Sequence, residues 1–195
     1  MPANFFTLPG ELRNQIYHLL TSAEPVNPWS KRGHNLATNL IRTNKTIQRE
    51  AAWVLYGGNI FDFRPPVHLL YEGDAFLDRI GPHNARHIRH IQFDMFLLLF
   101  EDPREYRMFD AILRMFSKIQ SDCSNLKTLV VSQVSFTVLE ILLSGQIDAA
   151  GVIADFDARA RTIASLEGII LDVPRESQVP YLREKMEGHG WKFKG

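Results

Sequence analysis

Hydrophobic residues near the N-terminus recur at the spacing of an amphipathic helix. Such a helix is expected from about Leu8 to Leu20. Thr7 can cap it, Pro9 fits its first turn, and Glu11 lies near the positive end of the helix dipole. The apolar stripe of this helix consists of Leu8, Leu12, Ile16 and Leu19.

A loop from Ser22 to Asn35, which contains prolines and a glycine, follows this first helix. Asn35 is suited to capping a second helix, which is expected to end at the Gly57–Gly58 pair. The apolar stripe of the second helix consists of Leu36, Leu40, Ile47, Ala51 and Val54.

Beyond Gly58 the pattern changes to short apolar runs that alternate with amphipathic stretches, which predicts strands separated by helices. The expected strands are Asn59–Phe63, Ile88–Phe93, Leu126–Val131 and Leu166–Val173. The expected helices are Asp74–Ile80, one that begins at Asp102 and buries Tyr106, Phe109, Leu113, Phe116 and Ile119, then Ala149–Ile163 and Val179–Glu187.

The strand centres near Ile91, Val130 and Ile170 recur at intervals of about 40 residues, so a β/α repeat is plausible. Right-handed crossovers would make these strands parallel. The almost continuous apolar run Leu166–Leu171 suggests a strand covered by helices on both faces. The expected fold is α/β, with N-terminal helices in residues 1–57 and a short parallel sheet of β/α units in residues 58–195, joined in one continuous core.

Composition and charge limit the classes of function. Of the 195 residues, 45% are hydrophobic, which predicts a chain that folds throughout. Its 22 Lys and Arg residues equal its 22 Asp and Glu residues, so the formal charge is zero. This balance argues against a uniformly basic face for nucleic acid.

Cysteine content and hydropathy indicate a compartment. Cys123 is the single cysteine, so the chain has no internal disulfide and suits a reducing environment. The N-terminal residues lack a signal-peptide pattern, and the longest apolar run, Met95–Phe100, is too short to span a bilayer. We therefore expect a soluble protein of the cytoplasm or nucleus, without a membrane association.

Three spaced blocks in the first third of the chain resemble the fungal F-box-like proteins. Two later segments look like the irregular leucine-rich-type repeats that often follow such a motif. The first three blocks are Phe6-x-Leu8-Pro9-Gly10-Glu11-Leu12-Arg13-x-x-Ile16-Tyr17-x-x-Leu20, Leu40-Ile41-Arg42-Thr43-Asn44-Lys45-x-Ile47-x-Arg49-Glu50-Ala51, and Leu55-Tyr56-Gly57-x-Asn59-x-Phe61-x-Phe63. The later segments are Ile80-Gly81-Pro82 with Ile88-Arg89-His90-Ile91, and Cys123-Ser124-Asn125-Leu126-Lys127-x-Leu129.

The resemblance implies that the N-terminal helical motif docks on a Skp-type adaptor of a cullin ubiquitin ligase, while the repeats hold a substrate protein. Its docking residues would be Leu8, Pro9, Leu12 and Ile16. Alternatively, this stripe packs on the following β/α unit. The chain would then be a stand-alone binding or effector-like protein that has lost adaptor docking. The long loop before Leu36 and the polar pair Thr43–Asn44, where an apolar pair is common in F-box motifs, favour that alternative.

Histidines and arginines gather at the start of the second expected strand. His83 and His87 have a spacing that can bind a metal on a helix, but the strand begins at once and no cysteine or nearby carboxylate completes a site. We expect a solvated strand entrance here. The alternative is a small patch for an anion or RNA, formed by Arg86, His87, Arg89 and His90.

Enzymatic function has little support in the sequence. It contains no phosphate-binding glycine loop, Gly-x-Ser-x-Gly motif or Cys-x-x-Cys pair, and Cys123 has no histidine partner placed beside it. Phe96, Leu98 and Phe100 either continue a buried strand or form a patch for a protein partner. The resulting hypothesis is a non-catalytic interaction module without cofactor or metal; a small enzyme that uses the histidine cluster is the third alternative.

Overall fold

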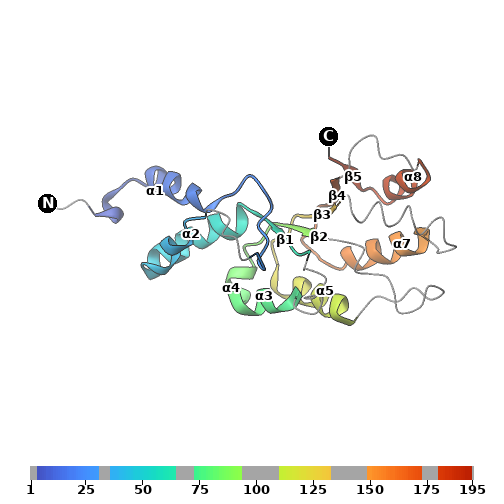
Figure 1. The fold of residues 1–195 in the computed structure, drawn as a ribbon, viewed down its shortest axis with the longest axis horizontal. Coiled ribbons are helices and arrows are strands. Elements are labelled where there is room, and N and C mark those ends of the chain that lie inside the picture. The colour runs from blue at the N-terminus through green and yellow to red at the C-terminus, as the bar shows by residue number, and fades with distance from the viewer. Residues whose placement is uncertain are drawn as a thin grey trace.

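The computed structural model describes residues 4–30, 36–64, 73–93, 110–132, 149–172 and 180–194. The molecule is elongated: helices α1 and α2 lie toward one end and the last helix and strand lie at the other (Figure 1). Among the described helices, none has both the length and the apolar character that crossing a bilayer requires.

The N-terminal unit consists of α1 (Gly10–Tyr17) and α2 (Lys45–Gly57) with three 3₁₀ turns, Phe5–Thr7, His18–Leu20 and Thr38–Arg42. Helix α1 begins after Pro9 and has no side-chain cap, so the expected start at Leu8 with Thr7 as the cap is wrong. The second expected helix is divided, because the Asn44 side chain accepts a hydrogen bond from the Thr46 N–H at 2.7 Å and starts α2 there. Asn35 lies outside the described residues.

The five strands in the described residues form one parallel sheet, in which each strand pairs with the next in chain order. The parallel arrangement expected from the β/α alternation is therefore confirmed. The last strand has only two residues, and no strand was expected there. The strands are β1 (Ile60–Asp62), β2 (His90–Phe93), β3 (Thr128–Ser132), β4 (Gly168–Asp172) and β5 (Lys192–Phe193).

The connecting helices cover one face of this sheet, because right-handed connections between sequential parallel strands all return on the same side. Strand β4 alternates between buried and half-buried positions, so one of its faces is less covered than its apolar run suggested, whereas β2 and β3 are buried at every position after the first. The connecting helices are α3 (Gly73–Ile80), α4 (Pro82–Ala85), α5 (Asp110–Asp122), α7 (Ala149–Ala160) and α8 (Pro180–Gly188).

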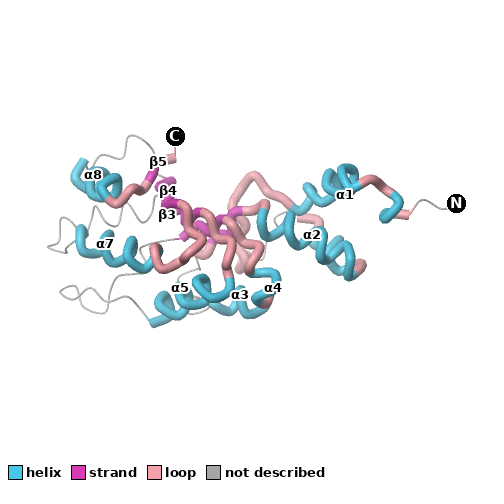
Figure 2. The backbone as a smooth tube through the Cα atoms, turned by 180° about the vertical axis from the view of Figure 1, so that it is seen from behind, coloured by secondary structure: helices cyan, strands magenta, loops and turns pink. Residues whose placement is uncertain are grey.

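Buried residues form two hydrophobic clusters. The larger lies between the sheet and its helices and includes Ile91, Leu129 and Phe156. The smaller lies between α1 and α2 and includes Tyr17 and Leu20. Figure 2 shows the same division from behind, with α1 and α2 at one end of the tube and the strands in the middle.

Asn59, just before β1, joins the N-terminal unit to the sheet. Its side chain is buried; it donates to the Leu20 and Leu55 carbonyls at 2.7 Å each and accepts from the Ser22 N–H at 2.7 Å. Buried polar groups that are fully hydrogen-bonded fix the geometry around them. The ends of both helices are therefore fixed to the start of the sheet.

Candidate interaction surfaces of the N-terminal unit

Helix α1 and the segments that flank it, including the Phe5–Thr7 and His18–Leu20 turns, carry an uncovered apolar surface. Leu12 is 43% exposed, Leu19 61% and Phe6 41%. Leu8 and Ile16 are half-buried and belong to neither hydrophobic cluster, whereas Pro9 is exposed. We name Phe6, Leu8, Leu12, Ile16 and Leu19 the α1 stripe; it brings together three of the four residues expected to dock on an adaptor.

The opposite side of α1 is fixed to α2 through one carboxylate. Glu50 accepts from Arg13 Nε at 3.0 Å and from the Tyr17 hydroxyl at 2.9 Å. The hydrogen bonds from Arg13 and Tyr17 lower the pKa of Glu50. Burial, together with the bond to Glu50, raises the pKa of Tyr17 to about 12. This network holds α1 with its buried side on α2, so the α1 stripe faces away from the unit's core.

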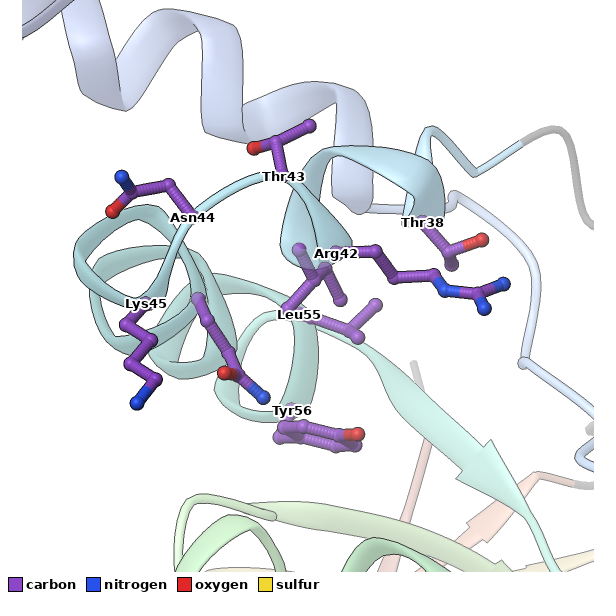
Figure 3. Close-up of a pocket in the computed structure, with 9 residues that line it drawn as sticks. Thr38, Arg42, Thr43, Asn44, Lys45, Leu55 and Tyr56 are labelled. Atoms are coloured by element: carbon purple, nitrogen blue, oxygen red, sulfur yellow. The ribbon is translucent and has the colours of Figure 1, made fainter.

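A pocket of about 530 Å³ lies between the Thr38–Arg42 turn and α2 (Figure 3). Tyr56 lies at its edge, and burial raises the pKa of that phenol. Arg42 and Lys45 extend in different directions around the pocket in Figure 3. Because its cations do not converge, the pocket does not form a site for one small anion.

The outer side of α2 is basic and carries an exposed tryptophan. Lys45, Arg49 and Trp53 follow one another at intervals of four residues, so they lie on one side of the helix. All three are exposed, Trp53 by 52%. The guanidinium of Arg89, from the segment before β2, lies 5.1 Å from the centroid of the Trp53 ring. We name Lys45, Arg49, Trp53 and Arg89 the basic face.

The histidine cluster is divided between α4 and β2. The rings of His83 and His87 contact each other at 6.0 Å. His90 is in β2, where its Nδ1 lies 2.7 Å from Thr128 Oγ1. Burial lowers the pKa of His87, and the positive charges of Arg86, His83 and Arg89 lower it further. Within the described residues, no group of three or more His, Cys, Asp or Glu side chains could hold a metal ion.

The side chains of His90 and Arg89 have different neighbours: His90 contacts Thr128 of β3, and Arg89 lies against Trp53 of α2. Burial lowers the pKa of His90, Arg89 lowers it further and Glu167 raises it. Arg89 also lies close to Gly57, where an added Cβ would come within 3.7 Å of its Nε. Arg89 therefore lies beside α2 and His90 beside β3, while the charge of Arg89 lowers the pKa of both His87 and His90. The anion patch stays a prediction.

Cys123 is fully buried in the larger hydrophobic cluster. Burial raises the pKa of its thiol to about 12, and Asp122 adds to this effect. A thiol with such a pKa is protonated near neutral pH and is a poor nucleophile. The structural role expected for Cys123 agrees with this environment.

The proposed partner surface Phe96, Leu98 and Phe100 lies outside the described residues, as does the helix start at Asp102. Sequence reasoning missed the basic face. The signal was present in the spacing of Lys45, Arg49 and Trp53, opposite the apolar stripe of α2. The contribution of Arg89 could not be found this way, because it comes from a segment forty residues further along the chain.

No protein-family model, curated protein or solved structure matches this chain.

Proposed function

We propose that this protein is a non-catalytic interaction module whose F-box-like N-terminal unit docks on a Skp-type adaptor through the α1 stripe. The observation that carries the proposal is the exposure of Leu12 and Leu19 on a helix whose other side is already packed. Short amphipathic helices commonly bind by placing a few such apolar anchors in a partner's groove. A few anchors of this kind carry most of the energy of a typical interface.

The position of the unit also supports docking. Helices α1 and α2 lie at the end of the molecule that is remote from α8 and β5, and both views show this separation (Figures 1 and 2). A partner could therefore approach α1 without meeting the helices of the sheet. The α1 stripe is absent from the cluster beneath the sheet, which opposes the alternative in which it packs on the β/α units.

The sheet supports a role for the β/α units as a leucine-rich-type scaffold that holds a second protein. Sequential parallel strands with helices on one face are the arrangement of a solenoid, whose other face is a common binding surface. Register places Asp62, Gln92 and Val130 side by side on the face of the sheet opposite the larger cluster, but all three are buried, so they do not form an exposed binding surface.

The rival function is a stand-alone binding or effector-like protein without adaptor docking. The long loop Ser22–Asn35 and the Thr43–Asn44 departure from the F-box pattern were its two supports in the sequence. In the structure Asn44 caps α2, which accounts for a polar residue at this place without reference to an adaptor. The polar pair is therefore weaker evidence against adaptor docking than it was in the sequence alone.

Co-elution with a purified Skp-type adaptor on size-exclusion chromatography tests the proposal. The wild-type protein should form a complex, and a Leu12→Asp, Leu19→Asp variant should not. Tyr181→Asp is the matched control, because Tyr181 is 45% exposed on α8, at the other end of the molecule. It should co-elute like the wild type.

Circular dichroism establishes that each variant is folded before it is applied to the column. A wild-type protein that does not bind the adaptor would refute adaptor docking and leave the stand-alone function. Equal loss of binding in the Tyr181→Asp control would also contradict docking through the α1 stripe.

A further inference from the structure

The basic face of Lys45, Arg49, Trp53 and Arg89 has no role in the α1 docking surface, and its charges are uncompensated. Among the described residues, no carboxylate lies within ion-pair distance of Lys45, Arg49 or Arg89. The sequence from Leu36 to Arg49 contains no Asp or Glu, and neither does the segment from Gly81 to Phe93. Positive charge therefore dominates this side of the unit.

The acidic residues nearest to the basic face along the chain already form ion pairs elsewhere. Within residues 36–64 the only carboxylates are Glu50 and Asp62. Glu50 binds Arg13, at the interface with α1, and Asp62 binds Arg64 at 2.7 Å. Neither is available to neutralise the basic face, so its charges have no acidic partner among the residues that the structure describes.

Trp53 and Arg89 form a cation–π contact within the basic face. The guanidinium of Arg89 lies above the indole, and the Arg89 stem passes beside Gly57 of α2, where an added Cβ would be in ordinary van der Waals contact with it. Stacking holds the guanidinium plane while its N–H edge can still bind a carboxylate with two hydrogen bonds. Exposed Trp and Arg side chains are also the residue types most enriched at the energetic centres of protein interfaces.

The spacing of the cations fits an extended acidic chain. Residues four apart on a helix are separated by about 6 Å along its axis. Alternate side chains of an extended peptide recur every 6.6–6.8 Å or so on one side. Carboxylates at alternate positions could therefore meet Lys45 and Arg49 in turn, with a third at Arg89.

We propose that the basic face binds an acidic segment, rich in Glu or Asp, of a protein partner. Nucleic acid is less well matched. Single-stranded nucleic acid is held by several aromatic platforms along a basic groove. The basic face has one aromatic ring, which Arg89 already covers on one side, and the whole chain has a formal charge of zero. The proposal does not depend on adaptor docking, because the α1 stripe is not part of this face.

The test is a titration of the full chain with a fluorescently labelled Glu/Asp-rich peptide, in the absence of any adaptor. Binding should saturate and weaken as salt rises. A Lys45→Glu, Arg49→Glu variant should bind at least about tenfold more weakly, since two attractive contacts become repulsive. The emission of Trp53 should change on binding, and a Trp53→Phe variant should lack that change.

Matched variants separate a specific site from general charge. Lys185→Glu with Lys192→Glu changes the net charge equally at the far end of the molecule, where both side chains are exposed, and should leave affinity unchanged. Leu12→Asp with Leu19→Asp should also leave peptide affinity unchanged, even where it abolishes adaptor binding. Arg89→Lys keeps the charge but not the paired hydrogen bonds, so it should weaken binding by a smaller factor than the double reversal.

Three results would overturn the proposal. The first is the absence of saturable binding by the wild-type protein. The second is equal weakening by both charge-reversed pairs, which would show a general charge effect. The third is tighter binding of a single-stranded oligonucleotide of matched charge that is lost in the Lys45→Glu, Arg49→Glu variant, which would make nucleic acid the occupant.

Discussion

Replacing Leu12 by Asp should leave the protein folded, whereas replacing Leu20 by Asp should not. Leu12 is 43% exposed and Leu20 is fully buried, although both belong to the first helical segment. Burying a whole leucine side chain contributes about 1.5–3 kcal/mol. Because little more than half of Leu12 is covered, its replacement should cost about 1 kcal/mol.

The buried position carries a much larger cost. At Leu20 the full transfer free energy is lost, a cavity forms, and a carboxylate enters an apolar cluster. Together these effects exceed about 4 kcal/mol, which approaches the total stability of an ordinary domain. In a chain of this size about 1 kcal/mol corresponds to roughly 2–4 °C in Tm.

Thermal unfolding followed by circular dichroism measures the difference. Leu12→Asp should lower Tm by a few degrees and keep the wild-type spectrum at room temperature, and Leu20→Asp should lose helical signal or melt far earlier. Equal destabilisation by the two substitutions would show that Leu12 is core. That result would refute the reasoning that makes α1 a docking surface.

Further predictions concern polar contacts and the thiol. The pKa of Glu50 is lowered, so its bonds to Arg13 and Tyr17 stabilise the fold at pH values above the ordinary pKa near 4.5. This stabilisation is lost as the pH falls through the folded-state pKa. Glu50→Gln should lower Tm at neutral pH and flatten the decline of Tm in acid, which thermal melts at a series of pH values would measure. Asn59→Ala leaves buried backbone groups without partners and should cost about 3 kcal/mol in denaturant unfolding; a cost below about 1 kcal/mol would contradict its linking role. Cys123, buried and with a pKa raised to about 12, should react with a thiol reagent at pH 8 only once denaturant is added.

Much of the parallel sheet could be predicted, because its strands carry local signals. The centres at Ile91, Val130 and Ile170 lie in β2, β3 and β4, and right-handed connections then fix the strands as parallel. Strand β5 could not be found, since two residues carry no periodicity. The partial exposure of one face of β4 was also missed, because Ile170 on that face is apolar yet only half-buried.

The N-terminal unit shows where local patterns stop being informative. Periodicity identified the leucines of α1 as one stripe, but periodicity cannot show whether a stripe faces its own chain or a partner. The direction in which the stripe faces depends on Tyr17 and Arg13. Both side chains bind Glu50 of α2, so the side of α1 that carries them packs on α2. The basic face likewise needed a tertiary contact, because Arg89 reaches Trp53 only after β2 has paired with β1.

Hydrogen–deuterium exchange of the protein with and without a Skp-type adaptor tests the central claim most directly. The account predicts slower exchange across Gly10–Leu20 in the complex, with little change in α7, α8 and β5. Protection confined to the β/α units, or no protection of α1 in a complex that does form, would contradict docking through the α1 stripe.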